Sequence, residues 1–168
     1  MDVTPVATLD LSRYLGLWYE VGRLPMNHED DRASDVTAEY SLEEDGHVRV
    51  DNRCLDDDGD PTQALGRATP DPERPGCLEV TFLPAGLRWI PFTTADYWVL
   101  RIDESYSTAL VGTPDRRFLW LLSRSPYIDP GTESAYLATA TEQGYDLGPW
   151  IRTPQSGSRV TDATLEAR

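Results

Sequence analysis

The sequence predicts an all-β fold, an antiparallel up-and-down barrel or a sandwich, with one α-helix late in the chain. Short segments of alternating apolar and polar residues recur at a spacing of about ten residues, which is typical of such folds. Residues that favour turns, chiefly Gly, Asp and Pro, separate these segments. A single later segment has the spacing and the end residues of a helix. The 168 residues suffice for one domain with one core.

Eight strands follow from the alternation and from the turns between them. The Asp45-Gly46 pair provides the positive φ that a hairpin needs, and Asp58-Gly59 marks the next turn. Three prolines between residues 70 and 76 exclude regular structure there. The predicted strands span residues 17–24, 36–42, 47–54, 62–69, 78–82, 96–103, 107–113 and 117–124.

The predicted helix has clear start and stop residues. Asp129 can cap its N-terminus, Pro130 suits the first helical position, and Gly144 suits the position after the last turn. Tyr136 and Ala140 share one side of this helix, which predicts packing against the outside of the strands.

The domain is predicted to cover residues 1–155. Residues 149–153 predict a short final strand. Residues 156–168 are polar and predict a flexible C-terminal tail.

Charge and composition exclude several functions. The 15 basic and 29 acidic residues leave a net charge of −14, which argues against binding to a nucleic acid. The acidic segment at residues 56–58 lacks the pattern of a calcium loop, since Leu65 falls where a bidentate Glu is needed. His28 and His47 have no partners at zinc-ligand spacing. We therefore expect no metal, no cofactor and no nucleic-acid partner.

Three short motifs, in order, give the sequence a family resemblance. Gly16 and Trp18 begin the first strand, Asp103 opens the turn between the sixth and seventh, and Arg124 ends the eighth. Together they resemble the motifs of the lipocalin family. The late helix and the segment after it resemble the subgroup of bacterial lipocalins, plant temperature-induced lipocalins and apolipoprotein D. This resemblance implies an eight-stranded up-and-down barrel, or calyx, with the helix packed outside.

The resemblance also implies which end of the barrel is closed. Trp18 closes the floor from inside, and the Arg124 guanidinium stacks on its ring while donating to backbone carbonyls. Gly16 and Asp103 belong to the same structural floor. These residues are therefore expected to have a structural role.

Side-chain alternation predicts the interior wall. Residues two apart along a strand face the same side, and the reference positions are Trp18 and Arg124, which face inward, and Arg101, which faces outward. The residues placed inside are Glu20, Gly22, Leu24, Trp98, Leu100, Ile102, Phe118, Trp120 and Leu122. Glu20 is expected to be hydrogen-bonded and structural. The predicted ligand-binding residues form an apolar wall with few polar groups and are Tyr40, Val48, Val50, Asn52, Phe82, Trp98 and Trp120.

The function that the resemblance implies is non-covalent binding, storage or transport of a small hydrophobic ligand. Fatty acids, lysophospholipids and similar amphiphiles are the implied ligands. Two alternatives stay open: a lipocalin-fold enzyme that uses the pocket thiol of Cys54, and a filled barrel that acts as a structural or partner-binding module. We expect no enzymatic activity and no catalytic residue, and a monomer or weak dimer.

An apolar loop containing Trp89 and Phe92 is predicted at the open end. It either forms a portal lip that touches a membrane transiently or folds over the rim. The N-terminus shows neither a secretory signal nor a lipobox cysteine, which predicts a cytoplasmic location. A removed signal would instead imply a periplasmic or membrane-associated protein. Cys54 and Cys77 are predicted at opposite rims, roughly 20 Å apart and hence as free thiols.

Overall fold

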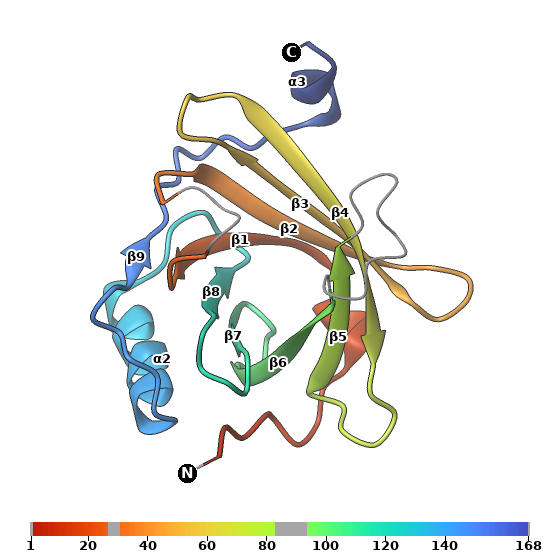
Figure 1. Cartoon of the computed structure of the whole chain (residues 1–168), viewed down its shortest axis with the longest axis vertical. Coiled ribbons are helices and arrows are strands. Elements are labelled where there is room, and N and C mark those ends of the chain that lie inside the picture. The colour runs from red at the N-terminus through yellow and green to blue at the C-terminus, as the bar shows by residue number, and fades with distance from the viewer. Residues whose placement is uncertain (1, 27–30, 83–93, 168) are drawn as a thin grey trace.

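The chain folds into a closed antiparallel barrel (Figure 1), which confirms the predicted fold class and excludes the sandwich. This computed structural model describes residues 2–26, 31–82 and 94–167. The strands in these ranges are β1 (Gly16–Arg23), β2 (Ser34–Leu42), β3 (Val48–Leu55), β4 (Pro61–Pro70), β5 (Cys77–Phe82), β6 (Thr94–Ile102), β7 (Thr108–Gly112), β8 (Leu119–Ser123) and β9 (Ile151–Arg152). β2 to β8 pair in sequence order, and β1 closes the ring by pairing with both β8 and β2. All eight predicted strands are present, with ends shifted by a residue or two.

The predicted helix is confirmed as α2 (Pro130–Glu142), which lies outside the ring of strands (Figure 1). Oδ2 of Asp129 accepts a hydrogen bond from the amide of Thr132 at 3.1 Å, which satisfies one free donor of the first turn. Gly144 follows the helix with a φ of 89°, a conformation that glycine adopts without strain.

Two short helices were not predicted. α1 (Leu11–Tyr14) precedes β1, and Asp10 caps it by accepting from the amide of Ser12. α3 (Asp162–Glu166) lies near the C-terminus. None of the helices in the described ranges has the length and hydrophobicity needed to cross a bilayer.

Two β-bulges change which side chains face the interior. One lies in β1 between Glu20 and Gly22, opposite β8, and the other lies in β6 between Val99 and Arg101, opposite β7. A bulge inserts one extra residue into a strand, so the inward–outward alternation shifts by one position beyond it.

The apolar core forms two layers. The inner layer fills the lower part of the barrel and includes Trp18, Tyr40, Val50, Val99 and Leu122. The outer layer lies between the barrel wall and α2 and includes Val21, Leu110, Leu121, Tyr136 and Ala140. The helix therefore covers the outside of β7, β8 and β1, as its apolar side predicts.

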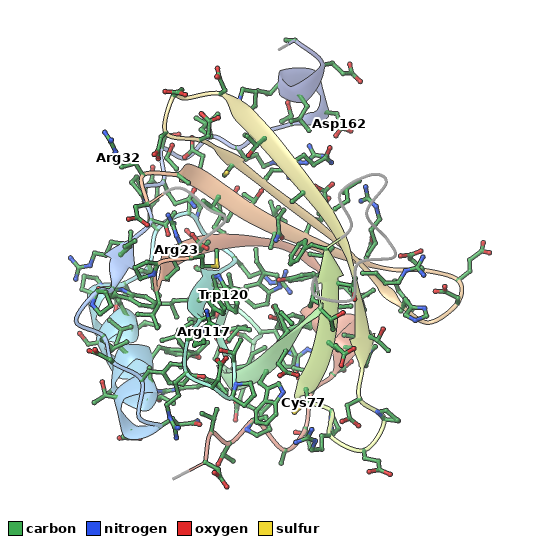
Figure 2. The ribbon with its side chains drawn as sticks, in the orientation of Figure 1. Arg23, Arg32, Cys77, Arg117, Trp120 and Asp162 are labelled. Atoms are coloured by element: carbon green, nitrogen blue, oxygen red, sulfur yellow. The ribbon has the colours of Figure 1, made fainter. Side chains whose placement is uncertain are left out.

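The C-terminal segment follows the outside of β2, β3 and β4. The amide of Asp35 donates to the carbonyl of Pro154 at 2.9 Å, and the Arg53 guanidinium binds the carboxylate of Asp162 at 2.6 Å. Figure 2 labels Asp162 on α3. Val160 is only 3% exposed. The segment thus has defined contacts, while the domain end at residue 155 and the flexibility beyond it stay predictions.

Candidate functional site

The closed end of the barrel is sealed by Trp18 and Arg124. Trp18 is 0% exposed, and its indole N–H donates to the carbonyl of Tyr14 at 2.9 Å. The Arg124 guanidinium carbon lies 3.8 Å from the centre of the Trp18 ring. The same guanidinium donates to the carbonyls of Leu17 at 2.8 Å and Leu15 at 3.0 Å, so it ties the start of β1 to the end of β8. This arrangement is the stack that the sequence predicts.

Gly16 and Asp103 lie at the same end but do different things. Gly16 has a φ of 99°, and a Cβ there would lie 3.4 Å from Nη1 of Arg124. Oδ1 of Asp103 accepts from the amides of Ser107 at 2.7 Å and Thr108 at 2.9 Å, which fixes the β6–β7 turn. Asp103 therefore supports the floor by holding this turn, whose Tyr106 carbonyl accepts from Arg124.

Asp103→Asn should destabilise the protein by about 1 kcal/mol near neutral pH and have less effect in acid. Burial acts to raise the pKa of Asp103, but hydrogen bonds from Ser107, Thr108 and Ser105 outweigh it and hold the pKa below its ordinary value of 3.8. A lowered folded-state pKa means that the carboxylate stabilises the fold above the ordinary value and that this contribution disappears as the pH falls through the lower one. Urea unfolding of both proteins at neutral and acidic pH measures this; an equal difference at both would contradict it.

Six of the seven predicted wall residues face the barrel interior. Val48 and Val50 follow each other up β3, and Tyr40 lies opposite Val50 on β2. Asn52 lies one inward position further along β3, between Ala38 and Ala64 on the neighbouring strands. The remaining two inward residues are Phe82 on β5 and Trp120 on β8.

Trp98 was wrongly predicted to face inward, and so was Leu100. Both belong to the apolar layer outside the barrel, and Arg74 lies over the Trp98 ring with its guanidinium carbon 5.0 Å from the ring centre. Tyr97 and Val99 face inward instead. The bulge in β6 explains the error: Leu100 and Arg101 both face outward, so an alternation counted back from Arg101 is one residue out of step.

The bulge in β1 has the same consequence for Gly22 and Leu24, which were predicted inside. Gly22 pairs with the outward Leu121, and a Cβ on it would clash with the Trp150 ring outside the barrel. Leu24 also belongs to the outer layer. Arg23 takes the inward position beside Trp120, its partner on β8 (Figure 2).

Arg23 and Glu20 form a buried ion pair that the sequence reasoning missed. Nη1 of Arg23 lies 2.9 Å from Oε2 of Glu20, and the two side chains are 0% and 5% exposed. The hydroxyl of Thr153 donates to the same carboxylate oxygen at 2.7 Å. Glu20 is thus hydrogen-bonded, as predicted, and the pair joins β1 to the segment after β9. The one sequence feature that could have indicated this pair is an arginine, Arg23, at the end of a predicted strand.

The interior is closed at the floor and open at the opposite end. Val48, Val50 and Val80 are each 4% exposed or less, whereas Asn52 and Phe82, further along the same strands, are partly exposed. Two small residues show the accessibility of the open end most clearly. Ala64 pairs with the inward-facing Asn52, and Ala95 pairs with the inward-facing Val80, so both alanines face inward, yet both are exposed. Solvent therefore reaches inward-facing residues at the open ends of β3 to β6.

Three tyrosines lie above the floor and were not predicted as a group. Tyr97 binds the hydroxyl of Tyr40 at 2.8 Å and also that of Tyr14, and the Tyr14 and Tyr40 rings are stacked with centres 5.6 Å apart. Tyr14 comes from α1, which is short enough to escape detection by periodicity. The sequence feature that could have indicated α1 is Asp10, which caps its N-terminus.

The remaining predicted features fall outside this site. Cys54 and Cys77 form no disulfide, as predicted; Cys54 contacts Thr62 across β3 and β4, and Cys77 pairs with the outward Trp98. Trp89 and Phe92 of the predicted portal, and His28, lie outside the described residues.

The acidic turn between β3 and β4 brings three carboxylates within 4.8 Å of one another, those of Asp56, Asp58 and Asp60. Oδ1 of Asp56 accepts from the amides of both Asp58 and Asp60, which is the hydrogen bonding of a tight turn. The turn geometry accounts for this cluster.

Fold and site together define the class of protein. A closed antiparallel barrel, sealed at one end by a buried tryptophan under an arginine and accessible inside at the other, is a calyx. The family model of the lipocalin-like domain matches residues 9–155, so this chain belongs to the lipocalin family.

Relatives of known name are similar over most of their length. Temperature-induced lipocalin-1 of Arabidopsis thaliana is 35% identical, over 92% of this chain and 84% of the relative. Outer membrane lipoprotein Blc of Escherichia coli K12 is 40% identical, over 93% and 85%. Apolipoprotein D of Mus musculus is 32% identical, over 88% and 77%.

Solved structures support the fold. Apocrustacyanin C1 aligns with a TM-score of 0.72 at 17% identity, covering 95% of this chain and 86% of its own. Insecticyanin from the tobacco hornworm Manduca sexta aligns with a TM-score of 0.71 at 22% identity, covering 98% and 88%.

The comparisons do not support the predicted cytoplasmic location. Several bacterial relatives are named outer membrane lipoproteins, which points to a membrane or periplasmic setting for those proteins.

Proposed function

We propose that this protein binds a small hydrophobic molecule, a fatty acid, lysophospholipid or similar amphiphile, non-covalently inside its barrel, and so stores or transports it. The observation that carries the proposal is the exposure of the inward-facing Ala64 and Ala95 above a sealed floor. Membership in the lipocalin family supports the same function.

The chemistry of the wall favours an apolar ligand. Val50, Phe82 and Trp120 offer apolar surface, and Asn52 adds one amide whose Oδ1 is buried and has no hydrogen-bond partner among the described residues. Each methylene group that leaves water for this wall is worth about 0.8 kcal/mol, before the cost of ordering the ligand. Affinity should therefore rise with chain length until the chain fills the interior.

We propose a binding protein and not an enzyme. Membership in the lipocalin family supports this part of the proposal, and the inward residues named above are mostly apolar. Transient membrane contact through Trp89 and Phe92, and a monomeric or weakly dimeric state, remain part of the proposal.

Titration with dodecanoic acid or a lysophosphatidylcholine should change the tryptophan fluorescence, because Trp120 faces the interior. Trp98→Phe is the matched control: Trp98 lies outside the barrel, so this variant should keep the ligand response, whereas Trp120→Phe should reduce it. Absence of any response in the unmodified protein, together with no binding heat, would contradict the proposed function.

A further inference from the structure

The hydroxyl groups of Tyr14, Tyr40 and Tyr97 meet inside the barrel just above its floor. Tyr14 and Tyr40 are 2% and 7% exposed, and Tyr97 is partly exposed. Burial raises the pKa of Tyr40 to about 12 and holds the pKa values of the other two well above their ordinary value, so all three groups keep their protons.

These three residues, here called the tyrosine triad, have one more O–H donor than they have hydrogen bonds to one another. Tyr97 is bonded to Tyr14 and to Tyr40, which makes two hydrogen bonds for three O–H donors. Whichever way the bonds run, one O–H has no acceptor within the described part of the chain. A buried hydroxyl donor without an acceptor is costly, so the site favours anything that supplies one.

A small cavity adjoins all three tyrosines. It has a volume of about 10 Å³, and its other lining residues are apolar: Leu11, Val48, Ala68, Leu78 and Val80. Such a volume is close to the least that can hold one water molecule, or one atom of similar size. The three tyrosines line this cavity with their rings, and their hydroxyl groups lie beside it as the nearest polar atoms of its lining residues.

The cavity lies directly below the accessible part of the interior. Ala68 and Val80 form one inward pair of β4 and β5, and the next inward pair towards the open end is Gly66 and Phe82, both partly exposed. On β4 and β5 the cavity thus lies one residue pair below partly exposed positions, which places the triad at the depth where the inner end of a bound chain would arrive.

We propose that the tyrosine triad binds a neutral hydroxyl group at the buried end of the ligand, so that the preferred ligands are long apolar chains that end in a hydroxyl. A ligand hydroxyl accepts the spare tyrosine proton and donates its own to a tyrosine oxygen. Four hydroxyls then share four hydrogen bonds and no donor is left over. This inference rests on the proposed function, since it names the chemistry of the deep end of the same site.

The test compares two ligands of equal length and shape, 12-hydroxydodecanoic acid and tridecanoic acid, which differ only by a terminal hydroxyl in place of a methyl group. Both are titrated by calorimetry into the unmodified protein and into the triple variant Tyr14→Phe/Tyr40→Phe/Tyr97→Phe. Removing all three hydroxyls is necessary, because any one tyrosine left behind keeps a spare proton. The ratio of the two affinities should shift by about tenfold or more towards tridecanoic acid in the variant.

A ratio that stays within about twofold would overturn the inference while leaving the proposed function intact, and it would mean that the spare proton binds water only. Failure of both acids to bind the unmodified protein would overturn the two together.

A second measurement needs no variant. Nuclear Overhauser contacts should join the protons on C12 of bound 12-hydroxydodecanoic acid to the tyrosine rings. Contacts from the C2 protons at the carboxylate end instead would overturn the inference.

Discussion

Trp18→Ala should lower the free energy of unfolding by about 3–5 kcal/mol, the range for removing a large buried aromatic side chain. Trp18 is 0% exposed and contacts the Tyr14 ring as well as Arg124. Its loss leaves a cavity at the closed end and takes away the surface on which the Arg124 guanidinium lies. The barrel floor should therefore lose more than the transfer energy of the ring alone.

Urea unfolding followed by far-ultraviolet circular dichroism measures this loss. Trp98→Ala serves as the control, because Trp98 is partly exposed outside the barrel and its removal opens no interior cavity. The control should lose much less stability. If Trp18→Ala unfolded at the same urea concentration as the unmodified protein, the structural role of Trp18 would be wrong.

Arg23→Met should cost about 3–5 kcal/mol near neutral pH, because it leaves the Glu20 carboxylate buried without its cation. Burial already raises the pKa of Glu20, while Arg23 and Thr153 act to lower it. Without Arg23 that pKa should rise further. A raised folded-state pKa means that the penalty is present above it and shrinks as the pH falls through it, because protonation removes the buried charge.

The double variant Glu20→Gln/Arg23→Met separates charge from packing. It carries the same change at Arg23 but no buried carboxylate, so it should be more stable than Arg23→Met near neutral pH and show a weaker dependence on pH. Unfolding of both variants in neutral and mildly acidic buffer measures this. Equal stability of the two variants at both pH values would mean that the ion pair stabilises the fold through the packing of its side chains and not through their charges.

Local features of the sequence were sufficient for most of the fold. Asp129, Pro130 and Gly144 each favour a helix end by their own conformational and hydrogen-bonding preferences, and the helix begins and ends where they predict. Asp45-Gly46 likewise forms the β2–β3 turn, with a φ of 88° at Gly46. The floor was predictable because Trp18 and Arg124 lie within recognisable motifs.

The orientation of the wall was predictable only where the strands are regular. Val48, Val50 and Asn52 alternate without interruption, and all three face the interior as predicted. Beyond the bulge in β1, Arg23 replaced Gly22 and Leu24 inside. In β6, Tyr97 replaced Trp98 for the same reason.

The sequence by itself determined the strands, the outer helix and the sealed end, because turn residues, caps and motifs act over a few neighbouring positions. The tertiary structure alone decided which residues line the upper interior. A bulge depends on how a strand pairs with a neighbour far away in the chain, and one inserted residue turns the side chains beyond it to the other face. The tyrosine triad has the same origin: Tyr14, Tyr40 and Tyr97 belong to α1, β2 and β6, and only closure of the barrel brings their hydroxyls together.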